Sequence, residues 1–174
     1  MLAGGAVGLR ARVEADVAVL HAELYDDVPT RIRGDSRPWT PLAAESPRSP
    51  YAVADGDDSV AFFSIVELPS GELAGEALLY SIDPHNRSAH AGLALRPSCR
   101  GKRLSAPVLE LLCHYGFEIR GLHRLQLETL SDNEPMIRAA RRTGFVEEGR
   151  LRDARWVDGR FADELVFGRL RQST

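Results

Sequence analysis

The residues best suited to chemistry in this chain lie at 96–105, where the sequence reads Arg-Pro-Ser-Cys-Arg-Gly-Lys-Arg-Leu-Ser. An alternating, strand-like run at 89–95 precedes this segment, and an apolar run with helical periodicity at 107–119 follows it. A turn between a strand and a helix offers unpaired backbone N–H groups at a helix N-terminus, and basic side chains add positive charge. These are the properties that bind a pyrophosphate. A basic loop exposed to solvent is the plainer explanation of the same residues.

Two carboxylates are candidates for a different reason. Glu76 and Glu128 each interrupt an otherwise apolar, strand-like run. A buried carboxylate is costly unless a partner offsets its charge, and an arginine is the commonest partner. Each glutamate is therefore a candidate catalytic group or one half of a structural ion pair.

The composition is that of a globular protein and excludes several classes. The chain has 174 residues, 44% of them hydrophobic, which fits a single domain over residues 1–174 with a sizeable core. Its net charge of −3 gives no general attraction to nucleic acid or to an anionic membrane. Cys99 and Cys113 form neither a metal-ligand pattern nor a disulfide framework, and no apolar run approaches the ~18 residues of a membrane span. We expect a cytoplasmic protein without a bound metal.

The periodicity predicts an α/β fold, a mixed sheet with helices on both faces in the order β-α-βββ-α-β-α-ββ. Strands are expected at 9–13, 59–68, 73–82, 88–96, 124–130, 150–157 and 161–170, and helices at 14–25, from about 106 to 120 and at 133–143.

Local signals place the connections between these elements. The prolines of residues 28–50 exclude a long regular element there, and Asp158-Gly159 is a strong hairpin-turn dipeptide. The strand-helix-strand crossover of residues 89–130 should make its two strands parallel neighbours. The 96–105 turn then lies at the carboxyl end of its strand, where α/β sheets commonly bind ligands.

The turn and a later segment together resemble a known family. The helical segment from Asn133 to Phe145 ends in Gly-Phe, and in this order the two segments resemble the core of the GCN5-related N-acetyltransferases, the GNAT superfamily. The runs at 82–88 and 127–129 are similar to the ribosomal-protein N-terminal acetyltransferase (RimJ/RimL-like) branch. The resemblance implies the splayed GNAT sheet and acetyl-CoA as co-substrate for transfer of an acetyl group to a primary amine.

The family signature in the turn, Arg/Gln-x-x-Gly-x-Gly/Ala, is only partly present. Arg100 matches its first position, but Arg103 and Ser105 stand where the family has small residues. Pro107 suits the first turn of a helix, so we expect the helix to begin near Ala106 with Ser105 as its cap. The resemblance assigns cofactor binding to the main chain of Leu93 and Leu95, to Arg100, Gly101, Lys102, Arg103, Leu104 and Ser105, and to Asn133, which equally suits a helix cap.

The resemblance also points to a catalytic base. Several relatives have a glutamate on the strand before the turn, and this chain has His90 at that place. Histidine has an ordinary pKa near ~6.5, which suits proton transfer. A strand histidine paired with a neighbour is the alternative. His90, Glu76 and Glu128 are the predicted catalytic candidates, and Ala140 stands where the family often has a tyrosine as the acid, so another proton donor is needed.

The acceptor is left open by the sequence. A small amine and a protein N-terminus fit the resemblance equally, and we expect their pocket to lie between residues 28–50 and the final hairpin. A homodimer is also left open.

Two other functions remain as alternatives. A catalytically silent CoA-binding or ligand-sensing protein of the same fold would explain the departures at Arg103, Pro107 and Ala140. An RNA-associated module is the third hypothesis, although its arginines lack an interleaved aromatic platform, and we expect no direct nucleic-acid partner. Those arginines are Arg138, Arg141 and Arg142.

Overall fold

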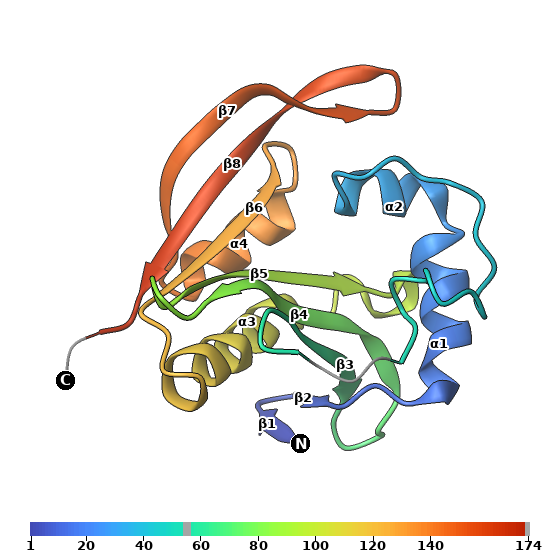
Figure 1. Cartoon of the computed structure of the whole chain (residues 1–174), viewed down its shortest axis with the longest axis horizontal. Coiled ribbons are helices and arrows are strands. Elements are labelled where there is room, and N and C mark those ends of the chain that lie inside the picture. The colour runs from blue at the N-terminus through green and yellow to red at the C-terminus, as the bar shows by residue number, and fades with distance from the viewer. Residues whose placement is uncertain (54–56, 173–174) are drawn as a thin grey trace.

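The computed structural model describes residues 1–53 and 57–172 and contains one eight-stranded mixed sheet (Figure 1). The sheet order is β1-β2-β3-β4-β5-β6-β8-β7, and β5 and β6 are the parallel pair among otherwise antiparallel neighbours. The strands are β1 (Leu2–Gly4), β2 (Val7–Arg10), β3 (Ala61–Glu67), β4 (Leu73–Asp83), β5 (Ser88–Leu95), β6 (Arg124–Leu130), β7 (Val146–Val157) and β8 (Arg160–Leu170). Residues 54–56 and 173–174 of the expected 1–174 domain lie outside the described residues.

Helices cover both faces of this sheet. They are α1 (Glu14–Leu20), α2 (Val28–Gly34), α3 (Ser105–His114) and α4 (Glu134–Arg142), and π-helical turns at His21–Tyr25 and Tyr115–Ile119 extend α1 and α3. None of the helices in the described residues is long and apolar enough to span a membrane.

Alternation along β5 divides the side chains between two apolar clusters. Ala91 belongs to the main core with α3 and α4, and Leu93 and Leu95 pack against that core. Ala94 packs instead against a second cluster that α1 builds on the opposite face. Because successive strand residues point to opposite faces, His90 shares the α1 side with Ala94. The predicted alternation is confirmed.

The sheet opens between its two parallel strands. β5 and β6 pair at Ser88–Arg124, Ala89–Leu125 and His90–Gln126. Beyond His90 both strands continue, β5 to Leu95 and β6 to Leu130, but they no longer pair, and Figure 1 shows them diverging. This divergence is the splay that the family resemblance predicts, and the 96–105 turn lies at its β5 edge.

The expected order of elements is confirmed, with corrections at several ends. The prediction of a first strand at 9–13 was wrong, because the strand is β2 and a short strand, β1, precedes it. The helix α2 lies in the proline-rich segment, with Pro29 in its first turn. The helix α3 begins at Ser105 rather than at Ala106, and Leu104 rather than Ser105 is its N-cap, without a side-chain hydrogen bond.

Candidate functional site

The turn after β5 carries a row of free hydrogen-bond donors. Within the part of the chain that the structure describes, the main-chain N–H groups from Gly101 to Ala106 donate to no protein acceptor. Pro107, which has no N–H, ends the row inside the first turn of α3. Consecutive free N–H groups at a helix N-terminus are suited to the oxygens of a phosphate. The turn therefore fits a diphosphate by its main chain.

Two residues of this turn have a left-handed backbone conformation, and one of them is the arginine that departs from the family signature. Gly101 has φ +79° and Arg103 has φ +61°, so both residues are left-handed. Glycine adopts this region at little cost, whereas a residue with a Cβ does not. Arg103 thus adopts a conformation that the glycine of the signature would adopt at less cost.

Two basic side chains of the turn contact other parts of the protein. The guanidinium of Arg100 donates to the carbonyl of Leu95 at 3.1 Å and to the hydroxyl of Thr30 on α2 at 3.0 Å. The ammonium of Lys102 lies 2.5 Å from the carboxylate of Glu67. All three contacts are exposed, and exposed contacts of this kind contribute little free energy, so both side chains can turn toward an anion.

The edge of β5 that faces the splay also carries free main-chain donors. The N–H of Arg96 donates to Ala74 on β4 at 2.9 Å. Successive N–H groups of a strand point to opposite edges, so those of Leu93 and Leu95 point away from β4, toward β6. Since β6 pairs with β5 only as far as His90, these donors face the open splay. Their role in binding the cofactor, which the family resemblance implies, stays a prediction.

Asn133 is the N-cap of α4. Its side-chain oxygen accepts from the N–H of Met136 at 3.4 Å, and its amide nitrogen donates to the hydroxyl of Thr129 at 3.0 Å. The capping half of the two predicted roles is confirmed. A contact with a bound ligand stays a prediction.

His90 and Glu128, two of the three catalytic candidates, are in direct contact. Nδ1 of His90 lies 3.0 Å from Oε1 of Glu128. The hydrogen bond to Glu128 raises the pKa of His90 above its ordinary value of 6.5, although partial burial opposes this effect. Burial would raise the pKa of Glu128, but hydrogen bonds from His90, Gln126 and Tyr80 lower it below its usual range. The pair thus favours a charged carboxylate beside an imidazole whose Nε2 is left for another partner.

Tyr80 belongs to the same network and was missed in the sequence. It lies opposite His90 across the β4–β5 pair, and its hydroxyl is 3.4 Å from Oε2 of Glu128. Burial and the nearby negative charge of Glu128 raise the pKa of Tyr80 to about 12, so the hydroxyl keeps its proton near neutral pH. Alternation along β4 puts Glu76 and Tyr80 on one face, which is the signal that could have found it.

Glu76, the third candidate, is held apart from this network. Its carboxylate lies 2.8 Å from the guanidinium of Arg12, and both side chains are almost fully buried. Burial raises the pKa of Glu76, and Arg12 opposes the rise. The arginine partner expected for a carboxylate in an apolar strand is present.

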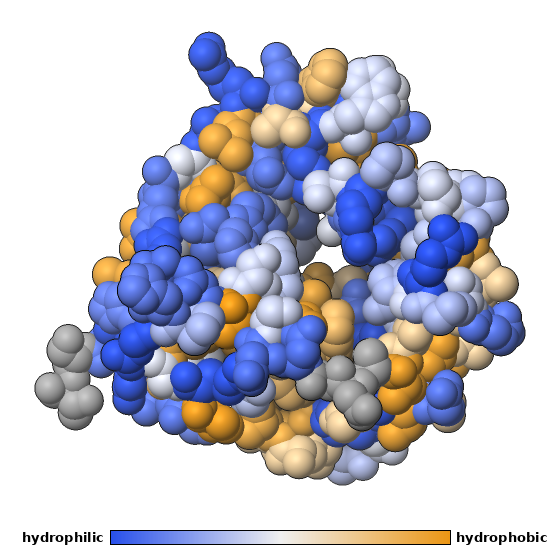
Figure 2. Space-filling view, in the orientation of Figure 1, coloured by the Kyte–Doolittle hydropathy of each residue, from blue (hydrophilic) through white to orange (hydrophobic). Residues whose placement is uncertain are grey.

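A hollow lies over this face of the sheet. Figure 2 shows it between the β7–β8 hairpin and the part of the molecule that carries α2. The helix α2 is tied to both edges of the splay, through Thr30 to Arg100 near β5 and through Arg33 to Asp132 after β6, where the ion pair measures 2.6 Å. The acceptor pocket is expected between residues 28–50 and the final hairpin, and its assignment to this hollow stays a prediction.

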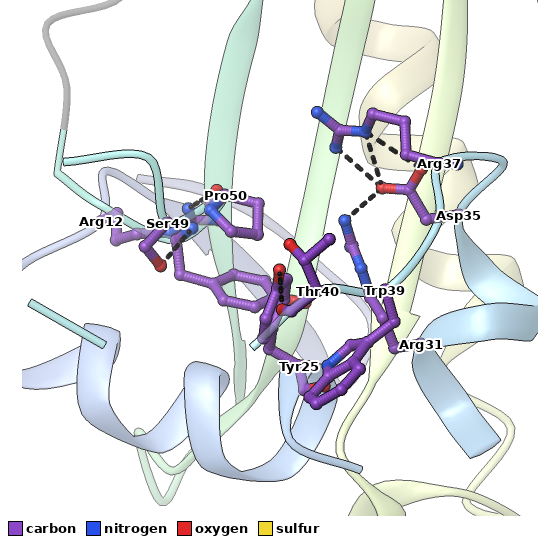
Figure 3. A network of polar contacts seen from close by, with 10 residues as sticks. Arg12, Tyr25, Arg31, Asp35, Arg37, Trp39, Thr40, Ser49 and Pro50 are labelled. Atoms are coloured by element: carbon purple, nitrogen blue, oxygen red, sulfur yellow. Dashed lines mark hydrogen bonds and ion pairs between the residues drawn. The ribbon is translucent and has the colours of Figure 1, made fainter. Parts of the chain in front are cut away.

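The segment after α1 is organised around one carboxylate. Figure 3 shows Asp35 between the guanidinium groups of Arg31 and Arg37. Arg37 donates to both oxygens of Asp35, the shortest contact being 2.7 Å. The indole of Trp39 donates to the carbonyl of Tyr25 at 3.0 Å, which satisfies the indole N–H.

In the described ranges, 1–53 and 57–172, no cluster of three or more His, Cys, Asp or Glu side chains is suited to a metal ion.

Comparisons with known proteins agree with this geometry. The family model for the acetyltransferase (GNAT) domain matches residues 7–146. The chain therefore belongs to the GNAT acetyltransferase family.

Several curated relatives match a part of the chain. The uncharacterized N-acetyltransferase p20 of Bacillus licheniformis is 30% identical over 110 residues, 63% of this chain and 62% of that protein. The spermidine N(1)-acetyltransferase of Vibrio cholerae is 29% identical over 57% of each chain. The ribosomal-protein-serine acetyltransferase of Escherichia coli is 28% identical over 59% of this chain and 57% of that protein. The matches thus span about 60% of these relatives.

A solved structure confirms the fold over nearly the whole chain. The spermidine N-acetyltransferase of Vibrio cholerae in complex with CoA and spermine superposes with a TM-score of 0.83 at 22% identity. The superposition covers 94% of this chain and 95% of the other.

Proposed function

We propose that this protein transfers the acetyl group of acetyl-CoA to a primary amine, by direct attack of the amine within a ternary complex. The row of free main-chain donors from Gly101 to Ala106, at the edge of a splayed sheet, carries the proposal. A chain of this family that had lost its cofactor would have no need to keep Arg103 in a left-handed conformation.

The residues present fit the cofactor along its length. The donors of the turn and the charges of Arg100, Lys102 and Arg103 suit the diphosphate. The N–H groups of Leu93 and Leu95 suit acceptor oxygens that enter the splay. When bound, acetyl-CoA supplies the activated acetyl group. The chain itself has to bind it, orient it and manage the proton and the charge of the reaction.

His90 is the proposed base. A protonated amine is not a nucleophile, so a group of the protein must take a proton from it before or during the attack. Glu128 holds Nδ1 of His90 and stabilises the charged imidazolium that forms when Nε2 takes the proton. Negative charge that develops on the carbonyl oxygen is stabilised by main-chain N–H groups of Leu93 and Leu95.

Two measurements test the proposal. Titration calorimetry with acetyl-CoA should show saturable binding, and release of free thiol should follow addition of an acceptor amine. A panel of polyamines, amino acids and N-terminal peptides covers the acceptor classes. Absence of acetyl-CoA binding contradicts the proposal altogether.

Binding without thiol release from any acceptor favours the second function, a silent CoA-binding or sensing protein. The observation that favours it is Ala140, which is fully buried in the core and supplies no proton donor.

The acceptor classes and the assembly belong to the same proposal. Two of the named relatives are a spermidine and a ribosomal-protein-serine acetyltransferase, and a small amine and a protein N-terminus are accordingly the two classes to test. We also propose that residues 1–174 form one domain and that two copies associate, since a related spermidine N-acetyltransferase is described as dodecameric.

A further inference from the structure

The charged side chains around the proposed acceptor hollow favour one class of acceptor over another. This inference depends on the proposed acetyl transfer. Besides Glu128, the carboxylates of Asp35 and Glu164 act on the pKa of Tyr80, and Asp35 acts also on the pKa of Glu76. Glu76 shares a face of β4 with Tyr80, and Glu164 on β8 lies opposite Leu130, which shares a face of β6 with Glu128. Asp35 ends α2, the helix that is tied to both edges of the splay. Four unpaired carboxylates here would attract a polycation.

In this protein three of the four carboxylates already have an arginine partner, and the fourth, Glu128, lies beside His90, which is cationic only when protonated. Asp35 pairs with Arg31 and Arg37, and Glu76 pairs with Arg12. Glu164 lies 2.7 Å from the guanidinium of Arg155 on β7. Glu128 pairs with His90. We call these four carboxylates and their partners the acceptor wall.

A polycation would gain little from such a wall. An ammonium that replaced Arg12 or Arg155 at its carboxylate would leave that guanidinium buried without its counter-charge. The side chains of these two arginines are only 4% and 13% exposed, so neither can swing into water. The existing pairs therefore compete with any second positive charge on the acceptor.

The segment that forms the near side of the hollow is itself basic. Residues 28–50 contain four arginines and two carboxylates, Asp35 and Glu45, which gives a net charge of +2. Arg37 shares Asp35 with Arg31 and has a side chain that is 71% exposed. Its charge is thus only partly compensated, and its side chain lies at the surface on the segment that borders the hollow; Figure 3 shows it against Asp35.

The wall also holds two donors without an acceptor. Among the described residues, the Nε atom of Arg12 and the Nη2 atom of Arg155 are buried and make no hydrogen bond. A buried donor without a partner destabilises the structure until it is satisfied. Glu164, the partner of Arg155, lies opposite Leu130, which shares a face of β6 with Glu128. Arg155 therefore lies on the same face as His90, and an acceptor oxygen that reaches its Nη2 on binding would satisfy this donor.

We infer that the acceptor is an amine accompanied by carbonyl or carboxylate oxygens, on a neutral or negatively charged molecule, and that Arg37 and Arg155 select it. An α-amine has this chemistry, either at the N-terminus of an uncharged or acidic peptide or in a free amino acid. A polyamine has the opposite chemistry.

A matched panel tests the inference. The rate of thiol release, as kcat/KM, is measured for a short peptide with a free N-terminus followed by acidic residues, for the same peptide with arginines, for a free acidic amino acid and for spermidine. The acidic peptide or the amino acid should exceed the basic peptide and spermidine by about tenfold, a ratio that corresponds to about 1.4 kcal/mol. The preference should shrink at raised ionic strength, because salt screens exposed charges.

Variants connect the preference to the wall. Arg37→Glu should reverse the order of the acidic and basic peptides, with acetyl-CoA affinity unchanged. Arg48→Glu is the control, because it makes the same change in net charge at another exposed position of the segment; it should shift the ratio much less. Arg155→Met should raise KM for acceptors that carry oxygens and lower it for spermidine, because Glu164 loses its cationic partner.

Three outcomes overturn the inference. Spermidine or the basic peptide is the best acceptor, or Arg37→Glu and Arg48→Glu shift the ratio equally, or Arg155→Met acts alike on all acceptors. Each of these leaves acetyl transfer itself intact. Binding of acetyl-CoA without turnover of any acceptor would instead contradict the proposed function.

Discussion

Arg103 is the residue at which the chain departs most from the signature of its family, and its backbone shows how the departure is tolerated. A left-handed conformation costs a residue with a Cβ about 1–2 kcal/mol, and the turn adopts it all the same. The side chain is exposed, so it makes no packing contact that would offset this cost. The main-chain donors of the turn are thereby kept in place.

Replacing Arg103 by glycine should therefore stabilise the protein. The gain is up to about 1 kcal/mol, because the freedom of glycine in the unfolded chain offsets part of the relieved strain. Thermal unfolding measures it, and calorimetry should show that acetyl-CoA binds at least as well. Arg103→Ala is the matched control, since it removes the same charge but keeps the Cβ. A glycine variant that is less stable than the alanine variant would refute the strain argument.

The contact between His90 and Glu128 predicts a pH profile. His90 acts as a base only when it is neutral, so kcat/KM should rise with pH through a pKa above 6.5. In Glu128→Gln the hydrogen bond to a charged carboxylate is lost, so the rising limb should move to lower pH while the maximal rate falls. Tyr80→Phe is the control that removes the weaker contact, and it should move the limb less. A profile that is identical in all three proteins would exclude His90 as the base.

The members of this site could be predicted from the sequence, but their partnerships could not. His90 and Glu128 can each be noted as ionisable residues of a strand, yet their contact depends on the register between β5 and β6, which no local pattern specifies. Tyr80 looks like an ordinary strand residue in the sequence, because its contact with Glu128 also depends on how the strands pair. The partner of Glu76 was expected to be an arginine, but only the packing of the chain determines that it is Arg12.

Among the elements, α2 is held in place by its contacts with both edges of the splay. Arg100 joins it to the end of β5, and Arg33 joins it to the residues after β6. The helix has only seven residues, too few to be stable alone, so these contacts and its junction with α1 determine its position.

Variants of Arg100 and Thr30 should distinguish the role of Arg100 in cofactor binding from its role in holding α2. Arg100→Glu should weaken acetyl-CoA binding several-fold, because it reverses charge beside the proposed diphosphate site. Thr30→Val removes only the link to α2 and should leave acetyl-CoA affinity within about twofold, while KM for the acceptor rises. Calorimetry and thiol release measure the two quantities. Equal losses of acetyl-CoA affinity in both variants would show that the contact, and not the charge, matters for the cofactor.

The start of α1 depends on Asp16. Its carboxylate accepts from the N–H of Val13 at 3.0 Å, from the guanidinium of Arg10 and from the hydroxyl of Ser64. Burial alone would raise the pKa of Asp16, but these bonds lower it from 3.8 to about 2. The carboxylate therefore contributes about 2 kcal/mol above the unfolded pKa, and this stability is lost as pH falls through the folded pKa.

Asp16→Asn should accordingly lower the free energy of unfolding by about 2 kcal/mol at neutral pH and flatten its decline between about pH 4 and pH 2. Denaturant unfolding at a series of pH values measures both effects. Glu14→Gln, an exposed change in the same turn of α1, is the control and should change stability by less than about 0.5 kcal/mol. A pH dependence in Asp16→Asn equal to that of the unmodified protein would contradict the assignment.

Elements with strong local signals were predicted well. The crossover of residues 89–130 and the Asp158-Gly159 hairpin are present as expected, the latter with positive φ at both residues. The strand β1 and the helix α2 were not predicted, because a strand of three residues has no period to detect and prolines obscure a short helix that begins with one. Tertiary pairing and the anchors of α2 supply what those sequences lack.

For the whole molecule, the sheet ends in an edge strand with exposed apolar side chains. The strand β7 is the last of the sheet and carries Trp156, 62% exposed, which packs on Phe161, 60% exposed, with ring centroids 4.9 Å apart. Exposed apolar side chains on an edge strand favour association with another chain. This surface is where we expect two copies to meet.

Light scattering should accordingly give twice the mass of one chain at micromolar concentration. Trp156→Lys combined with Phe161→Lys should return the mass to that of a monomer. The unfolding temperature of this variant should fall below that of the unmodified protein only by the amount that the dimer interface contributes. Leu170→Lys, at an exposed position at the far end of β8, is the control and should keep the higher mass. A single-chain mass for the unmodified protein would rule out the dimer.

The splay has one more consequence for the molecule as a whole. In the described residues, the backbone ladder joins the strands β1–β5 to the strands β6–β8 through three residue pairs. A ligand with amides along its length, such as the pantetheine arm of CoA, would bond to the free edges of β5 and β6. Such a ligand would add contacts between the two parts of the sheet, and the resistance of the protein to unfolding would rise with the acetyl-CoA concentration.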